Sequence, residues 1–148
     1  MSKKRFVDEA NIHVKAGDGG HGAVSFRKEK YIPKGGPDGG DGGIGGHIII
    51  QANSNLSTLL DLKLKQQFKA KNGGNGSRRN QYGKKGASIT INVPCGTLIK
   101  EDGHLIADLK NHNDSVIVAT GGKGGKGNAH FATSANKAPR KAQSGLPG

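Results

Sequence analysis

The stretch from 36 to 47 carries a glycine at every third position, and this spacing limits what the chain can fold into. A period of three fits neither an α-helix nor a β-strand, but it matches the left-handed polyproline II helix, which has three residues per turn. Glycine on every turn leaves one face bare, so another backbone can approach closely. The sequence therefore predicts short polyproline II helices packed against one another, too short for collagen, with these structural glycines: Gly36, Gly39, Gly42, Gly45, Gly121, Gly124 and Gly127.

Segments with strand-like patterns separate the glycine runs. Alternating or continuous apolar residues predict strands at 10–16, 23–26, 47–52, 88–93, 97–99, 105–109 and 115–119. The turn residues Glu101-Asp102-Gly103 predict a hairpin. Residues 58–62 can form a helical turn, but 62–65 alternate, so no long helix is expected. The predicted fold is all-β: a small β-barrel with projecting glycine-rich left-handed polyproline II helices.

Length, cysteine content and hydropathy restrict the class of protein. The 148 residues suit one domain, and periodic glycine runs between strands argue against disorder. The single Cys95 excludes an internal disulfide framework and suits a reducing compartment. No apolar stretch approaches the roughly 20 residues that span a bilayer. A cytoplasmic protein is therefore predicted.

The charge distribution predicts a polyanionic partner. The formal net charge is +12, and every charged side chain from Lys63 to Lys100, and from Ser115 onward, is basic. Such segregation is typical of nucleic-acid binding, and few aromatic residues are present to stack on bases. We therefore expect recognition of RNA shape and phosphates by cations interleaved with glycine: Lys28, Lys30, Lys34, Lys71, Arg78, Arg79, Lys84, Lys85, Lys123, Lys126, Lys137 and Arg140.

Two apparent nucleotide motifs do not fit a nucleotide site. Residues 17–22 and 122–127 match Gly-x-Gly-x-x-Gly, and a dinucleotide fold requires both a following helix and an acidic residue about twenty positions on. A second strand-like piece and Pro33 follow the first match, and no acidic residue follows the second. The Gly-Lys pairs precede Lys85, Gly124 and Gly127, where a phosphate-binding loop needs Ser or Thr. No nucleotide cofactor is predicted for this chain.

Asp38 and Asp41 lie three residues apart and would share one face of a polyproline II helix. A metal site or an acid–base pair is one interpretation, but capping of the backbone or pairing with nearby lysines is favoured. The six histidines and Cys95 show no metal-ligand spacing. We therefore predict no metal ligand and no catalytic residue.

Several motifs together resemble the amino-terminal domain of the Obg GTPases. They are Phe6-Val7-Asp8-Glu9-Ala10, the stretch 16–20, Ser25-Phe26-Arg27, the stretch 31–43, Val93-Pro94-Cys95-Gly96-Thr97 and the stretch 121–128. The resemblance covers nearly the whole chain. It implies an Obg domain over residues 1–143, with 144–148 as the start of a linker to a GTPase domain that this sequence does not contain.

The resemblance also implies a function for the parent protein. The family comprises bacterial, monomeric, magnesium-dependent GTPases that act in late assembly of the large ribosomal subunit and in stress and growth control. This domain is expected to contact rRNA near the peptidyl-transferase region, while GTP and Mg²⁺ belong to the missing GTPase domain, itself an expected partner. The alternative is a protein-interaction domain that docks a regulatory partner, with its basic charge incidental. Strong salt dependence of RNA binding would favour the RNA-binding function over this alternative.

Overall fold

Successive stretches of the chain belong in turn to two compact units. The computed structural model describes residues 8–26, 35–131 and 142–148. A strand-rich unit comprises 1–15, 48–69 and 89–119, and a glycine-rich unit comprises 16–47, 70–88 and 120–148. No helix in the described ranges is long and apolar enough to cross a membrane.

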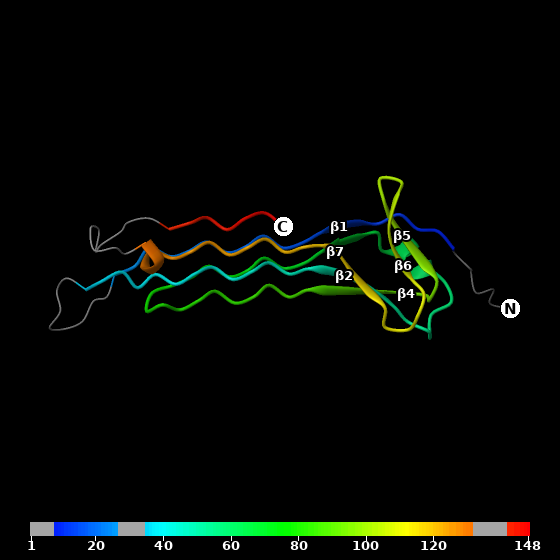
Figure 1. The fold of residues 1–148 in the computed structure, drawn as a ribbon, viewed down its shortest axis with the longest axis horizontal. Helices are drawn as coiled ribbons and strands as arrows, with labels where there is room; N and C mark the ends of the chain where they lie inside the picture. The colour runs from blue at the N-terminus through cyan, green and yellow to red at the C-terminus, as the bar shows by residue number, and fades with distance from the viewer. Residues whose placement is uncertain (1–7, 27–34, 132–141) are drawn as a thin grey trace. The chain divides into compact units, whose positions relative to one another are not determined.

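The strand-rich unit contains all seven strands of the described chain and one short helix (Figure 1). Strand β2 lies at the centre of a three-stranded sheet, parallel to β4 and antiparallel to β7. β1 pairs with β3 in parallel, and β5 and β6 form an antiparallel hairpin. The elements are β1 (His13–Lys15), β2 (Ile48–Ala52), α1 (Leu60–Leu64), β3 (Gln67–Lys69), β4 (Ile89–Val93), β5 (Thr97–Glu101), β6 (His104–Leu109) and β7 (Ser115–Ala119). The predicted all-β class is confirmed.

The core of the strand-rich unit follows from the alternation in β2 and β4. Ile48, Ile50 and Ala52 of β2 are buried, as are Ile91 and Val93 of β4. Successive side chains of a strand point to opposite faces, so these residues form one apolar layer. The sequence predicted β2 from its continuous apolar run and β4 from its alternation.

The described strands form separate sheets and no closed ring, so the barrel stays a prediction. Two other expectations about the strands need correction. Residues 23–26 contain only an isolated bridge from Phe26 to Pro37, because Ala23 instead donates its N–H to Gly40 and accepts from Asn128. Residues 62–65 do not alternate: α1 turns there, buries Leu62 and precedes β3, which the sequence did not predict.

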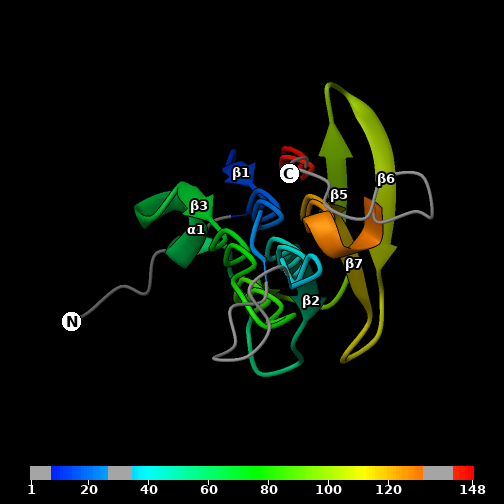
Figure 2. The same ribbon diagram turned by 90° about the vertical axis from the view of Figure 1, so that its left-hand side faces the viewer.

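The glycine-rich unit consists of extended segments that run side by side, seen end-on in Figure 2, and a short 3-10 helix, η1 (Asn128–Phe131). Segment 35–47 lies against several others, and its lateral hydrogen bonds recur every three residues. Gly17, Gly20 and Ala23 donate their N–H groups to the carbonyls of Gly46, Gly43 and Gly40 at 2.9 Å. Gly46, Gly43 and Gly40 in turn donate their own N–H groups to the carbonyls of Lys71, Gly74 and Ser77, at 2.8–2.9 Å. The period read from the sequence is the period of this hydrogen-bond ladder.

The backbones approach too closely for side chains at most of the predicted structural glycines. A Cβ on Gly39, Gly42 or Gly45 would lie within 3.0 Å of a backbone oxygen in segment 16–26. The same holds for Gly121, Gly124 and Gly127 against backbone oxygens of segment 35–47. Gly36 is different: a Cβ there would meet no atom of the described residues within 4 Å, so the close packing expected of it is not found among them.

Candidate nucleic-acid interface

Positive charge is concentrated in the glycine-rich unit. This unit holds fourteen of the 23 Lys and Arg residues and only four of the 11 Asp and Glu residues of the whole sequence. Its formal net charge is therefore +10, against +2 for the strand-rich unit. A field of one sign on one unit attracts polyanions to that unit.

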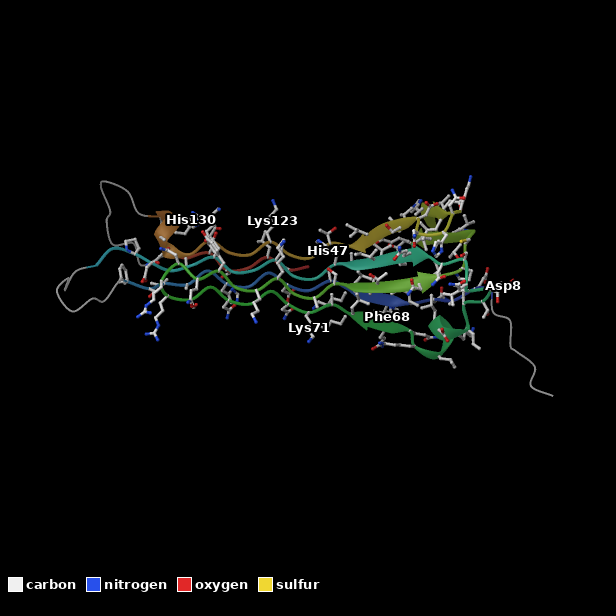
Figure 3. The ribbon with its side chains drawn as sticks, turned by 90° about the horizontal axis from the view of Figure 1, so that it is seen from below. Asp8, His47, Phe68, Lys71, Lys123 and His130 are labelled. Atoms are coloured by element: carbon white, nitrogen blue, oxygen red, sulfur yellow. The ribbon has the colours of Figure 1, made fainter. Side chains whose placement is uncertain are left out.

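Seven of the predicted RNA-binding residues lie in the described part of the chain, and all seven are exposed. None of them forms an ion pair with a described carboxylate. Figure 3 shows Lys71 and Lys123 pointing away from the segments that carry them. The seven are Lys71, Arg78, Arg79, Lys84, Lys85, Lys123 and Lys126; Lys28, Lys30, Lys34, Lys137 and Arg140 lie outside the described residues.

The three-residue repeat explains why Lys123 and Lys126 are exposed. Gly121, Gly124 and Gly127 form one row of segment 120–128, against segment 35–47. Gly122 and Gly125 form a second row, against the carbonyls of Leu146 and Gln143. The lysines occupy the remaining row, which faces solvent. The repeat thus sets their direction and spacing.

Arg78 and Arg79 lie in a tight turn between segments 70–77 and 81–88. Gln81 donates its N–H to the carbonyl of Arg78 at 3.4 Å, and the two central residues, Arg79 and Asn80, have φ values of 61° and 54°. This is a type I′ turn, in which asparagine is common and arginine is not. Asn80 also donates its N–H to the carbonyl of Asp38 at 2.6 Å, which ties the turn to segment 35–47.

Asp38 and Asp41 have different surroundings. The Oδ1 atom of Asp41 accepts the N–H of Gly127 at 2.8 Å and lies 2.9 Å from Nε2 of His130. Asp38 is only 3% exposed, and its Oδ1 has no hydrogen-bond partner among the described residues. Asp41 thus caps a backbone amide, and its carboxylate is engaged within the protein. Within the described ranges, no group of three or more His, Cys, Asp or Glu residues could hold a metal ion.

Sequence reasoning missed a set of side-chain acceptors that join neighbouring segments. Asn72 and Asn75 accept the N–H groups of Asp18 and His21 through Oδ1, at 2.9 and 2.8 Å. Nδ1 of His47 accepts the N–H of Gly121 at 2.7 Å. The asparagines are three residues apart, and so are the residues they bond. That shared spacing was the signal available in the sequence.

Residues 142–148 pack within the glycine-rich unit. Gln143 and Leu146 donate their N–H groups to the carbonyls of Lys126 and Lys123, at 2.9 and 3.0 Å. Gly19 donates to the carbonyl of Leu146 at 2.8 Å. The boundary between residues 143 and 144 stays a prediction, but the residues after it are hydrogen-bonded in the same way as those before it.

A groove of about 810 Å³ lies within the strand-rich unit. Its lining includes the apolar Ile12, Ile50, Leu62 and Val93, together with Cys95. None of the seven described RNA-binding candidates lines it. The groove and the exposed cations are therefore separate features.

Comparison with known proteins identifies a family. The family model described as GTP1/OBG matches residues 7–148. Proteins named GTPase Obg from Syntrophus aciditrophicus (strain SB), Prosthecochloris aestuarii (strain DSM 271 / SK 413) and Thermoanaerobacter sp. (strain X514) are 58%, 55% and 57% identical to the chain. Each alignment covers 97% of this chain, but only 43%, 45% and 34% of the respective relative. The chain spans less than half the length of these relatives.

Proposed function

Because the chain belongs to the GTP1/OBG family, as its Obg domain, we propose that it is the RNA-binding domain of a larger GTPase that acts in assembly of the large ribosomal subunit. The parent protein would be a cytoplasmic monomer active in stress and growth control. It would bind GTP and Mg²⁺ in the part that this chain lacks. The chain itself would bring no catalytic group, and would contact rRNA near the peptidyl-transferase region.

One observation carries this proposal: the concentration of charge on the glycine-rich unit. Its seven described cations are exposed and unpaired with described carboxylates, whereas charges that serve only solubility have no reason to collect on one unit. Arg78 and Arg79 could each bind a phosphate with two parallel hydrogen bonds, and the lysines act as point charges. Phosphate contacts position a protein on RNA without reading its sequence.

The ladder of lateral hydrogen bonds supports a rigid RNA-binding element. A backbone already fixed by its neighbours loses little conformational freedom on binding, so more of the interaction energy appears as affinity. The three-residue period of the ladder fits left-handed polyproline II helices, which we include in the proposal together with the barrel arrangement of the strand-rich unit.

Charge reversal at matched sites tests the proposal. Replacing Arg78, Arg79, Lys84 and Lys85 with Glu should abolish binding to large ribosomal subunits. The control replaces four exposed lysines of the strand-rich unit with Glu, and should have a much smaller effect: Lys63, Lys65, Lys69 and Lys100. Both variants lower the net charge from +12 by the same amount.

Salt dependence gives a second readout. The unaltered chain should lose about 0.7–0.9 log units of affinity per log unit of salt for each phosphate neutralised. The first variant should lose most of that slope and the control variant little of it. Equal losses in both variants would mean that net charge alone drives binding, and would overturn the role of the glycine-rich unit.

A protein-docking function is the second candidate. Leu98, Leu105 and Ile106 of the β5–β6 hairpin are 52%, 57% and 42% exposed, and apolar side chains exposed together favour protein partners. Two results would favour this candidate over RNA binding: the chain binds a protein partner with an affinity that does not change with salt, and it shows no affinity for ribosomal subunits.

A further inference from the structure

Two side chains on one segment hold residues 142–148. Nδ1 of His21 accepts the N–H of Gly145 at 3.0 Å, and Oδ1 of Asp18 accepts the N–H of Gly148 at 3.0 Å. The backbone bonds of Gln143 and Leu146 to Lys126 and Lys123 complete the attachment on the other side. The segment is thus fixed at intervals of three residues, between segments 16–26 and 120–128.

The bond to His21 depends on the charge of the imidazole. Nδ1 accepts a hydrogen bond only while its lone pair is free, which requires the neutral ring with its proton on Nε2. Protonation places an N–H on Nδ1 directly opposite the N–H of Gly145, so that two donors face each other. Among the common side chains, histidine is the one that ordinarily changes charge between pH 5 and 8.

The groups around the contact between His21 and Gly145 come from four segments. Residues 142–148 carry no charged side chain. The adjacent segment 120–128 contributes Lys123 and Lys126, and segment 70–77 contributes the uncharged Asn75. Asp18, on the same segment as His21, accepts from Gly148 as a carboxylate, and carboxylates ordinarily take up protons only at lower pH than imidazoles.

We propose that residues 142–148 form a strap that detaches from the glycine-rich unit more readily when His21 is protonated. Release would leave unpaired the N–H groups of Gly19 and Gly22 and the carbonyls of Lys123 and Lys126, which the strap now satisfies. In a longer parent protein, the strap is the connection to whatever follows Gly148. Its docking would then respond to pH independently of any RNA bound elsewhere.

NMR relaxation of the whole chain tests the strap. Between pH 7.5 and pH 5.0, the ¹⁵N heteronuclear NOE of Gly145 and Leu146 should fall, while that of Ile89–Val93 in β4 stays unchanged. Loss of one hydrogen bond with a donor left unsatisfied should shift the docking equilibrium roughly tenfold or more. An NOE for the strap that stays constant down to pH 5.0 would overturn the proposal without any variant.

Substitution of His21 by an acceptor that does not titrate identifies the group. In His21→Asn, Oδ1 should accept the N–H of Gly145, as Oδ1 of Asn72 and Asn75 accept backbone amides in the same unit. The strap should then stay ordered at both pH values. His47→Asn is the matched control, because His47 also accepts through Nδ1 but bonds Gly121, and its strap should still be released. A strap that is still released in His21→Asn would refute the role of His21.

Discussion

Replacing Gly42 with alanine should test the close packing of the glycine-rich unit most directly. The added Cβ would overlap the backbone carbonyl of Gly20. Real Cβ atoms essentially never come within 3.0 Å of such an atom, so segments 35–47 and 16–26 must separate. The obstacle is backbone on both sides, and no flexible side chain can move out of the way.

The magnitude follows from the hydrogen bonds that this separation would break. Gly17, Gly20 and Ala23 donate their N–H groups across this contact to the carbonyls of Gly46, Gly43 and Gly40, each at 2.9 Å. At about 1–1.5 kcal/mol net for each bond, the loss is roughly 3–5 kcal/mol. That is a large part of the roughly 5–15 kcal/mol that stabilises an ordinary domain. The midpoint of thermal unfolding should fall by roughly 10–15 °C.

Gly36→Ala is the matched control. Gly36 belongs to the same three-residue repeat, but a Cβ there would meet no described atom within 4 Å. Alanine should leave the unfolding midpoint unchanged or raise it slightly, because it restricts the unfolded chain. Thermal unfolding followed by circular dichroism measures both variants. If Gly42→Ala unfolds within about 3 °C of the unaltered chain, the packing argument is refuted.

Two further predictions concern the Arg78–Gln81 turn and nucleotide binding. Arg79→Gly should raise the free energy of unfolding by up to about 1 kcal/mol. A left-handed backbone costs a non-glycine residue roughly 1–2 kcal/mol, but glycine loses more conformational entropy on folding, which offsets part of the gain. A clear loss of stability in denaturant unfolding would contradict the assigned strain. The chain should show no saturable binding of GTP or GDP in calorimetry, because its Gly-Lys pairs lack the following Ser or Thr; micromolar binding would contradict that analysis.

The strands that follow simple rules could be predicted from the sequence. β2 and β4 were read from their apolar residues, and the β5–β6 hairpin from its turn. The φ values of Asp102 and Gly103, 49° and 81°, are those that a tight hairpin turn requires. β3 was missed because only three residues pair there, and Phe68 alone is too little to define an alternating pattern.

The partners of each glycine run could not be predicted. A period of three shows that a face is bare, but it does not say which backbone fills it, because all the runs share the same period. Gly36 keeps the period, and yet a Cβ there would meet no described atom within 4 Å. Arg79 gave no local sign of its left-handed conformation, since only the following Asn80 is a residue that favours one. Tertiary hydrogen bonds, such as that from Asn80 to Asp38, decide these positions.

The two glycine rows of segment 35–47 restrict how proteins built in this way can change in length. One row, Gly39, Gly42 and Gly45, packs against segment 16–26. The other row, Gly40, Gly43 and Gly46, packs against segment 81–88. Deleting one or two residues would rotate every later glycine away from its partner, whereas deleting a whole triplet would keep both rows aligned. At about 3.1 Å of rise per residue, such a segment can lengthen or shorten only in steps of roughly 9 Å. Each step would have to be matched in the segments beside it, so insertions and deletions are expected in units of three and in several segments together.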